Sequence, residues 1–331
     1  MQNPIISHIE VKHLGPVKKW EADLANLNFF IGPNASGKSY VNMALYAMLT
    51  VATKEKADID KKLRFVFQEK EIKNLISWKE RKAEILLKIN ENVLSLHINK
   101  GKKAYLSKNT TVNLSSDNIN FISTPDVLNV YSAINLFVKE HAGSLGVSEN
   151  IIDFLTRLLN LEYPERTKVW KDILKEIEER IEAKFYIERG KIIASFNKRK
   201  KINIERVASG LKTFSLIYLA LKQGIIAPGG IVFIEEPEEH LHPEWQVIMA
   251  EVLVKMALKD VQLFVSTHSD YLLKKVNNLM QKTPELKEKI TAYLFTPDGK
   301  PKRLEIDKRG INLLPLLNTF YELYEEEQEL I

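Results

Sequence analysis

The stretch that most constrains the fold of this chain is "GPNASGKS" at residues 32–39, which matches the spacing G-x4-G-K-S/T. The apolar run "LNFFI" precedes it, and the helix-forming run "SYVNMALYAMLTVA" follows it. A strand, a glycine-rich turn and a helix in this order let backbone N–H groups surround an anion at the positive end of the helix. A plain glycine turn is the alternative, and the flanking strand and helix argue against it. The pattern predicts an α/β fold with a phosphate-binding loop.

The loop also assigns chemistry to particular side chains. The ammonium group of Lys38 is predicted to reach the β- and γ-phosphates, and the hydroxyl of Ser39 to bind Mg²⁺. The candidate nucleotide-binding residues of the loop are Gly32, Asn34, Ala35, Ser36, Gly37, Lys38, Ser39 and Tyr40. We therefore expect a bound nucleoside triphosphate, with Mg²⁺ as cofactor.

A second stretch, "IVFIEEPEEHLHP" at residues 231–243, runs from apolar residues straight into acids. In one interpretation its glutamates form a metal cage with His240 and His242, because alternate residues of an extended segment can converge on one ion. In the other it is the acidic strand end that a phosphate-loop protein requires, with Glu235 holding the hydrated Mg²⁺ and Glu236 acting as general base. The second interpretation is favoured, since the phosphate loop already demands such a site.

The remaining pattern predicts how these motifs are carried. Residues 53–82 should be helical, and residues 83–108 should form a β-meander. Helical periodicity dominates from about residue 125 to 185. From residue 213 onward apolar strands alternate with helices, which implies a parallel sheet with helical crossovers. The glutamate-rich end, "YELYEEEQEL", is expected to be a surface helix.

Four stretches in this order, "GPNASGKS", "ASGLK", "IVFIEEPEEHLHP" and "FVSTHSDYLL", resemble the motifs of ABC-type ATPase heads. The similarity is greatest to the SMC/RecF-like and OLD-family branch of AAA-type ATP-binding proteins, and it covers residues 1–50 and about 183–310. The resemblance implies a P-loop NTPase of α/β class, with a mixed or parallel sheet and an inserted β-meander plus helical lobe. It also implies an ATPase that uses ATP and Mg²⁺.

The resemblance assigns further site residues. Ser209 and Gly210 occupy the signature motif, which in this family contacts the γ-phosphate bound by the opposite subunit. A serine at the start of the predicted helix could also cap it. His268 matches the switch histidine that senses the γ-phosphate. The implied catalytic residues are Glu236 and His268, and the implied metal ligands are Ser39 and Glu235, where aspartate is more usual than Glu235.

Other elements of the family are poorly marked. Gln68 is the best candidate for the glutamine that contacts Mg²⁺, although it could equally lie on an ordinary amphipathic helix. The family usually contacts adenine from the first strands, so Lys12, His13 or Trp20 could serve.

The resemblance divides the chain into a head, residues 1–50 and 183–331, and an insert, residues 51–182. No sustained heptads run through the insert, so no coiled-coil arm is expected. The sequence ends soon after the last motif, and we expect no Toprim nuclease domain. An apolar stripe at Val169, Ile173, Ile177 and Ile181 should pack on the chain itself, with a dimer or partner surface as the alternative.

Composition excludes several classes of protein. The 331 residues include no cysteine, which excludes disulfides, cysteine-ligated zinc and thiol catalysis. No apolar run approaches the roughly 20 residues that span a bilayer, and the N-terminus lacks a signal-peptide pattern, so a cytoplasmic protein without membrane contact is expected. The net charge of +5 is mild, and the lysine runs at 100–105 and 197–201 leave nucleic-acid binding possible.

We expect an ATP-hydrolysing head that forms a homodimer, or a higher even oligomer, around two Mg·ATP. Resemblance favours control of an effector protein, a nuclease or toxin of the prokaryotic defence type. Two alternatives remain open at this stage: a DNA repair or recombination ATPase, and an ATP-gated scaffold that does not hydrolyse. The longer Glu235 and the unusual signature residues Leu211 and Lys212 keep the scaffold alternative open.

Overall fold

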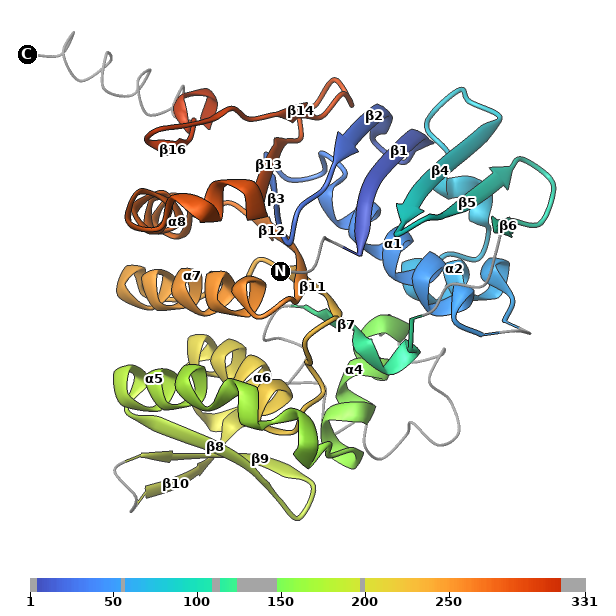
Figure 1. Cartoon of the computed structure of the whole chain (residues 1–331). Coiled ribbons are helices and arrows are strands. Elements are labelled where there is room, and N and C mark those ends of the chain that lie inside the picture. Colours follow the sequence, from blue (N-terminus) through green and yellow to red (C-terminus); the bar gives the residue numbers. More distant parts are fainter. Residues whose placement is uncertain (1–4, 55–56, 109–113, 124–147, 197–199, 317–331) are drawn as a thin grey trace, which may run out of the picture.

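The computed structural model describes residues 5–54, 57–108, 114–123, 148–196 and 200–316 (Figure 1). A six-stranded sheet in the order β14-β13-β3-β12-β11-β7 forms its centre. Neighbouring strands from β13 to β7 are parallel, and β14 pairs antiparallel at the edge. The strands are β3 (Leu27–Ile31), β7 (Ile119–Ile122), β11 (Ile231–Glu235), β12 (Gln262–Thr267), β13 (Ile290–Leu294) and β14 (Lys302–Arg303). The predicted fold class, including its mixed sheet, is confirmed.

The central strands are buried on both faces because alternate side chains enter two different cores. On β3, Phe29 belongs to one core and Phe30 to the other. The ring of Phe264 from β12 stacks on that of Phe233 from β11 at 5.0 Å, in the same core as Phe30. A shift of one residue in register would send each side chain into the opposite core, so both cores would have to repack.

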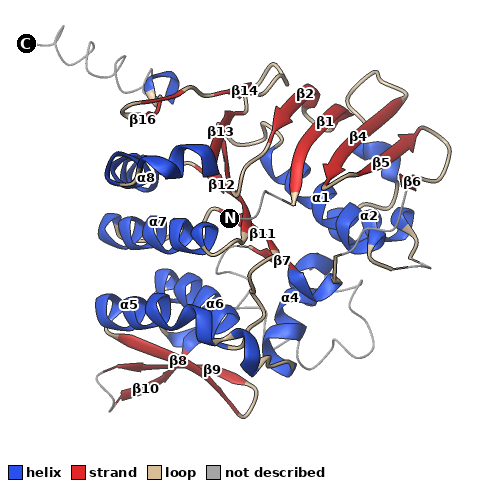
Figure 2. Ribbon diagram, viewed as in Figure 1, coloured by secondary structure: helices blue, strands red, loops and turns tan. Residues whose placement is uncertain are grey.

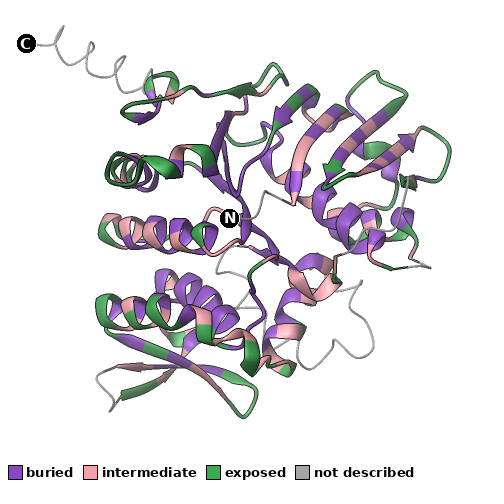
Figure 3. Ribbon diagram, viewed as in Figure 1, coloured by how far each residue is buried: buried purple, intermediate pink, exposed green. Residues whose placement is uncertain are grey.

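Helices cover both faces of the six-stranded sheet (Figure 2). On one face stand α5 (Lys171–Ile181), α6 (Ser209–Lys222), α7 (Pro243–Leu258) and α8 (Asp270–Lys282). On the other lies α1 (Lys38–Ala52), whose apolar residues join the second core. α6 is buried from Gly210 to Leu221, as Figure 3 shows by colour, which agrees with its largely apolar sequence.

A second, antiparallel sheet packs over α1 in the order β2-β1-β4-β5-β6. Its strands are β1 (Ile6–Leu14), β2 (Val17–Asp23), β4 (Lys82–Ile89), β5 (Asn92–Asn99) and β6 (Tyr105–Lys108). The side chain of Gln262 on β12 ties the two sheets together, since its Oε1 accepts from the Ile6 N–H at 2.8 Å and its Nε2 donates to the Ile6 carbonyl at 2.7 Å.

The predicted meander is confirmed, and it extends the sheet of β1 and β2 because β4 pairs directly with β1. β7, also within residues 51–182, pairs with β11 in the central sheet. The predicted insert therefore contributes strands to both large sheets. The division into a head and an insert at residues 50/51 and 182/183 stays a prediction. In the fold, strands of the predicted insert pair with strands of the predicted head.

A third sheet, β8 (Ala183–Glu188), β9 (Lys191–Phe196) and β10 (Lys200–Asn203), lies beside α5 and α6. The predicted stripe on α5 packs on the chain itself: Ile173, Ile177 and Ile181 are buried in the first core, and Val169 packs against it. Self-packing is thereby confirmed for these side chains.

The shorter elements complete the described chain. α2 (Ile59–Phe67) is the α-helix of the predicted helical stretch 53–82, and it ends where Gln68 takes a left-handed φ of 55°. The others are α4 (Glu149–Asn160), β15 (Ile306–Asp307), β16 (Gly310–Ile311) and single-turn 3₁₀ segments such as Ile72–Leu75. The predicted C-terminal helix lies outside the described residues. None of the helices described is both long and apolar enough to cross a bilayer.

Candidate functional site

The phosphate loop connects β3 to α1, and its glycines are required by the surrounding backbone. Gly32 has a φ of 140°, and a Cβ there would lie 2.1 Å from the carbonyl oxygen of Phe295. Gly37 has a φ of 104°, and a Cβ there would lie 2.7 Å from Cγ2 of Val17. Both positions combine a left-handed φ with a lack of space, which only glycine tolerates. Loops from β2 and β13 thus shape the cradle from outside.

Lys38 lies inside this loop. Its Nζ donates to the carbonyl oxygens of Gly32 at 2.8 Å and Pro33 at 2.9 Å, and Ser36 Oγ donates to the same Pro33 oxygen at 2.8 Å. Burial lowers the pKa of Lys38, while the nearby carboxylates of Glu236 and Glu235 raise it. The ammonium group is therefore held close to the backbone that would surround a phosphate.

Glu235 ends β11, opposite Ser266 of β12. Its Oε1 is shielded from solvent and has no hydrogen-bond partner among the described residues. Burial raises the pKa of Glu235 to about 7; a hydrogen bond with Ser39 opposes that rise, and the charge of Glu236 adds to it. A shielded carboxylate oxygen beside the Ser39 hydroxyl is the oxygen donor set that Mg²⁺ prefers, so the residues present fit this cation.

Glu236 faces His268 across the carboxyl edge of the sheet. Its Oε1 lies 3.4 Å from Nε2 of His268, and its backbone, at a φ of 45°, donates to the carbonyl of Ser266 at 2.9 Å. Burial and the charge of Lys38 lower the pKa of His268, while Glu236 raises it. Lys38, the pair Glu235 and Glu236, and His268 come from three distant parts of the chain, and they meet at one edge because β3, β12 and β11 are neighbours.

Glu238 also contacts this edge, and no sequence pattern predicted its role. Its Oε1 accepts from the hydroxyl of Thr267 at 2.8 Å and from the backbone N–H of His268 at 2.6 Å. Its Oε2 is shielded and has no hydrogen-bond partner in the part of the chain that is described. A run of four glutamates around Pro237 does not reveal which of them points back at the neighbouring strand.

Ser209 and Gly210 begin α6 and lie against residues of the acidic stretch. A Cβ on Gly210 would lie 2.9 Å from the carbonyl oxygen of His240 and from Cδ2 of Leu241. The N-cap is Ala208, and no side chain caps the helix. The expectation that Ser209 caps α6 is therefore wrong, because the serine is the first helical residue and not the residue before it. Its hydroxyl makes no hydrogen bond to the phosphate loop in the structure described here.

His240 and His242 occupy different positions. Nδ1 of His242 accepts from the Glu244 N–H at 3.4 Å and caps α7, while His240 is an exposed residue with a φ of 60°. Within the described ranges, no three His, Asp or Glu side chains are grouped so that they could hold a metal ion. The geometry gives the alternative metal cage no support.

The candidates for the adenine contact and for the Mg²⁺-contacting glutamine differ in their exposure to solvent. Trp20 is only 2% exposed and packs its ring on Phe30 and Phe295, so the expectation that it contacts adenine is wrong. His13 and Lys12 lie at the end of β1 and remain open to solvent in part. Gln68 is exposed beside Phe67, whose ring packs 5.2 Å from that of Tyr40.

An exposed aromatic residue that the sequence motifs did not mark lies near the turn between β1 and β2. Trp78 is 88% exposed. Its neighbour Ser77 donates through Oγ to the Gly15 carbonyl at 2.6 Å, and a Cβ on Gly15 would lie 2.5 Å from the ring of Tyr40. Trp78 is therefore carried on a segment bound to the β1–β2 turn, which contacts the first turn of α1.

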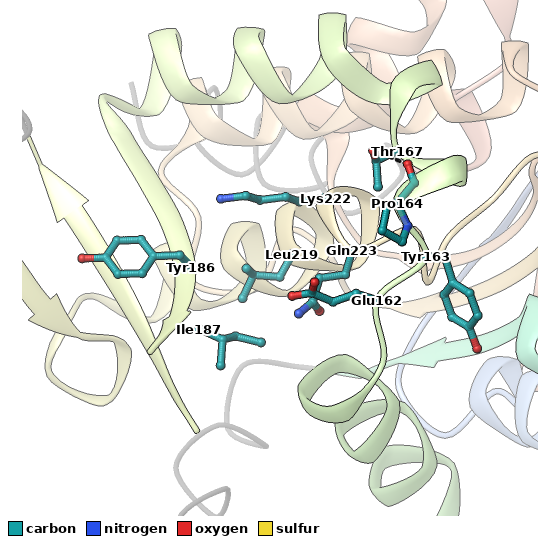
Figure 4. Close-up of a pocket in the computed structure, with 9 residues that line it drawn as sticks. All are labelled: Glu162, Tyr163, Pro164, Thr167, Tyr186, Ile187, Leu219, Lys222 and Gln223. Atoms are coloured by element: carbon teal, nitrogen blue, oxygen red, sulfur yellow. Dashed lines mark hydrogen bonds between the residues drawn. The ribbon is translucent and has the colours of Figure 1, made fainter. Parts of the chain in front are cut away.

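A separate cavity of about 300 Å³ lies at the other end of α6 (Figure 4). α6 has 14 residues and is about 20 Å long, which separates this cavity from Ser209. Lys222 donates to the carbonyl of Phe185 at 3.1 Å at its edge. The lining residues are Glu162, Tyr163, Pro164, Thr167, Tyr186, Ile187, Leu219, Lys222 and Gln223.

Comparison with known proteins concerns the class of protein. A family model described as "AAA ATPase domain" matches residues 5–142, and one described as "AAA domain, putative AbiEii toxin, Type IV TA system" matches residues 114–274. Among curated proteins, none matches the sequence significantly. The chain is an ATPase with sequence similarity to AAA ATPase domains.

Solved structures support the fold of this ATPase head. An SMC head bound to the C-winged helix domain of ScpA is similar over 92% of this chain and 99% of its own, with a TM-score of 0.60 at 18% identity. A Pyrococcus furiosus SMC head with an extended coiled coil, bound to the C-terminal domain of ScpA, is similar over 98% and 100%, with a TM-score of 0.52 at 17% identity. The Thermotoga maritima SMC head domain is similar over 91% and 99%, with a TM-score of 0.51 at 12% identity. At these identities the likeness concerns the fold.

Proposed function

We propose that this ATPase hydrolyses ATP at the carboxyl edge of the central sheet, with Glu236 as the general base. The observation that carries this proposal is the convergence of Lys38, Glu236 and His268, with Glu236 Oε1 3.4 Å from His268 Nε2. Glu236 would accept a proton from the attacking water, and the His268 imidazole would contact the γ-phosphate. Lys38 would leave its two backbone acceptors and turn to the β- and γ-phosphates.

Ser39 and Glu235 would hold Mg²⁺. The fit rests on the shielded, unpartnered Oε1 of Glu235 beside the Ser39 hydroxyl. When bound, the cation neutralises charge on the phosphate oxygens. Gly32 and the loop residues from Asn34 to Gly37 would present backbone N–H groups to the phosphates, and the longer Glu235 side chain would serve where aspartate is usual.

We further propose that two copies associate head to head, so that Ser209 of one contacts the γ-phosphate held by the other. The placement of Ser209 supports this, because it begins α6, whose second residue Gly210 packs against His240, and it makes no hydrogen bond to the phosphate loop of its own chain as described here. An anion would be favoured at the positive N-terminus of α6, which no side chain caps. Each complete site would then need residues from two subunits.

The biological role we propose is ATP-dependent control of a partner protein. Two of the similar SMC heads were solved with domains of ScpA bound, and one matching family model carries a toxin–antitoxin description. Both favour an effector or partner that responds to opening and closing of the dimer. More specifically, we propose that the partner is a toxin or nuclease of a prokaryotic defence system. We also propose that the chain is related to the OLD family.

The test combines light-scattering mass with phosphate release, for the wild type and for Glu236→Gln. We expect Glu236→Gln to form a dimer in Mg·ATP and to release phosphate about 100-fold or more slowly, because loss of a general base removes that order of rate. The exposed Glu244→Gln variant is a matched control, since Glu244 lies eight residues away and should retain wild-type turnover.

Two results would contradict the proposal. Equal hydrolysis by Glu236→Gln and wild type would remove Glu236 from the role of base. A wild-type protein that dimerises in ATP without releasing phosphate would favour the ATP-gated scaffold. Repeating the phosphate-release assay with linear duplex DNA tests the remaining alternative. Strong stimulation of phosphate release by DNA would favour a repair or recombination ATPase.

A further inference from the structure

Two segments meet behind the proposed catalytic residues. The acidic turn, residues 237–242, leads from Glu236 toward the start of α6. The switch segment, residues 267–269, carries His268 from the end of β12 to the start of α8. Neither segment is a helix or a strand along its length, so side-chain contacts must hold them together.

Glu238 joins these two segments with a single oxygen atom. Its Oε1 accepts both from the Thr267 hydroxyl, at 2.8 Å, and from the His268 backbone N–H, at 2.6 Å. The Thr267 hydroxyl oxygen in turn accepts from the Ser269 N–H at 3.0 Å. All three residues of the switch segment are therefore bonded directly or indirectly to one carboxylate of the acidic turn.

The same carboxylate-bearing residue also organises the acidic turn. The backbone carbonyl of Glu238 accepts from the Leu241 N–H at 2.9 Å. Beyond it, Leu241 and the carbonyl of His240 pack against Gly210, the second residue of α6. A second link runs parallel to the first, since Gln246 donates to the Leu241 carbonyl at 2.9 Å and bonds to Ser269 through its Oε1.

We propose that Glu238 is a positioning residue that makes the switch segment and the acidic turn move together. This inference rests on the proposed function, in which His268 contacts the γ-phosphate. A displacement of His268 by a few tenths of an ångström would then pull its N–H, and with it Glu238 and the turn that touches the start of α6. Nucleotide occupancy in one subunit would thus reach the surface that faces the other subunit.

The chemistry of Glu238 makes this testable with a conservative variant. Because one oxygen accepts both hydrogen bonds, the amide oxygen of Glu238→Gln can accept them equally, whereas Glu238→Ala removes both. If the hydrogen bonds matter, Gln should restore what Ala loses. If Glu238 acted through its charge alone, Gln and Ala would behave alike.

The first experiment measures steady-state phosphate release and equilibrium ATP binding for wild type, Glu238→Ala, Glu238→Gln and the control Glu244→Ala. We expect Glu238→Ala to lower kcat about tenfold or more, as misplaced catalytic groups do, with ATP affinity changed less than about twofold. Glu238→Gln should stay within about threefold of wild type, and Glu244→Ala should match it. Wild-type turnover in Glu238→Ala, or equal losses in Ala and Gln, would overturn the inference.

Hydrogen–deuterium exchange of peptides covering the two segments supplies a readout that does not depend on hydrolysis. In wild type, ATP should slow exchange in both the switch segment and the acidic turn. In Glu238→Ala it should slow exchange in the switch segment alone. Coupled protection in Glu238→Ala would overturn the inference. Suppose that the wild type releases no phosphate, yet ATP protects both segments in wild type and only the switch segment in Glu238→Ala. The inference would then stand, although the proposed hydrolysis would be wrong.

Discussion

The carboxyl edge of the central sheet and the start of α6 differ in how completely the chain equips them. At the edge, Lys38, Glu235, Glu236 and His268 come from three separate segments and meet within one subunit. At the start of α6, Ser209 has neither a capping role nor a hydrogen bond to the phosphate loop of its own chain as described. The first region brings the proposed catalytic residues together within one chain, whereas the second carries groups that we propose act on the nucleotide of a partner subunit. The predictions below separate the two.

The largest expected effect is at the edge. Lys38→Ala should weaken Mg·ATP binding about 100-fold, because a charge-assisted contact to phosphate would be lost. Isothermal titration of the nucleotide measures this directly. Lys54→Ala, at the exposed end of the same helix region, is the control and should bind as wild type. ATP binding by Lys38→Ala at wild-type affinity would mean that the loop does not hold the phosphates.

Ser209→Arg should have the opposite profile. It should leave ATP binding by the single subunit unchanged and reduce turnover about tenfold or more, since a bulky cation would occupy the trans contact. A 1:1 mixture with Lys38→Ala tests this sharply. Random pairing would give half heterodimers with one intact composite site, so up to about a quarter of wild-type turnover should return. No recovery in the mixture would argue against shared sites.

The third prediction concerns pH and Glu235. Burial raises the pKa of Glu235 to about 7 in the folded protein, above the ordinary value of 4.5. Between these values the folded state binds more protons than the unfolded state, so this group lowers stability as the pH rises toward 7 and beyond. Glu235→Gln, without nucleotide or metal, should therefore be more stable than wild type at pH 8, by on the order of 1–3 kcal/mol.

Urea unfolding at pH 8 and pH 5.5 checks this prediction. The advantage of Glu235→Gln should shrink as the pH falls through about 7. Glu244→Gln reports the effect of removing an exposed acid from α7. An advantage of equal size at both pH values would show that the substitution acts through packing and not through ionisation.

The smallest expected effect is at Trp78, which carries the most exposed large aromatic ring among the described residues. If the base of the nucleotide rests on this ring, Trp78→Ala should weaken ATP binding about threefold, the range of one aromatic contact. Binding of inorganic tripolyphosphate should be unchanged, because it has no base. Tyr105→Ala removes another exposed aromatic ring, on β6, and is the control. Equal losses for ATP and tripolyphosphate would reject a base contact.

Much of the fold followed from local pattern. Strands such as "LNFFI" and "IVFI" were predicted from continuous apolar runs, which parallel strands buried on two faces require. The motifs at strand ends then predicted which side chains could meet, because parallel neighbours end at one edge. That much depends only on spacing within short segments.

The errors and omissions depended on distant partners. Trp20 is buried because Phe295, 275 residues later, packs on its ring. The meander joined β1 through pairing that no local pattern announces. Glu238 is one of several glutamates in a row, and only the approach of β12 selects it for Thr267 and His268. Short-range spacing cannot encode these contacts, since they arise when separate elements pack.

The position of β3 has a consequence for how the protein is made. β3 is translated early, yet its two neighbours are β12 and β13, which begin at residues 262 and 290. The carbonyl of Phe295 also closes over Gly32. The loop between β3 and α1 can therefore take its final shape only after almost the whole head has left the ribosome. A chain that ended before Phe295 would lack the contact that closes the loop, so we expect it not to bind nucleotide. ATP binding by a nascent chain would then indicate that synthesis had passed Phe295.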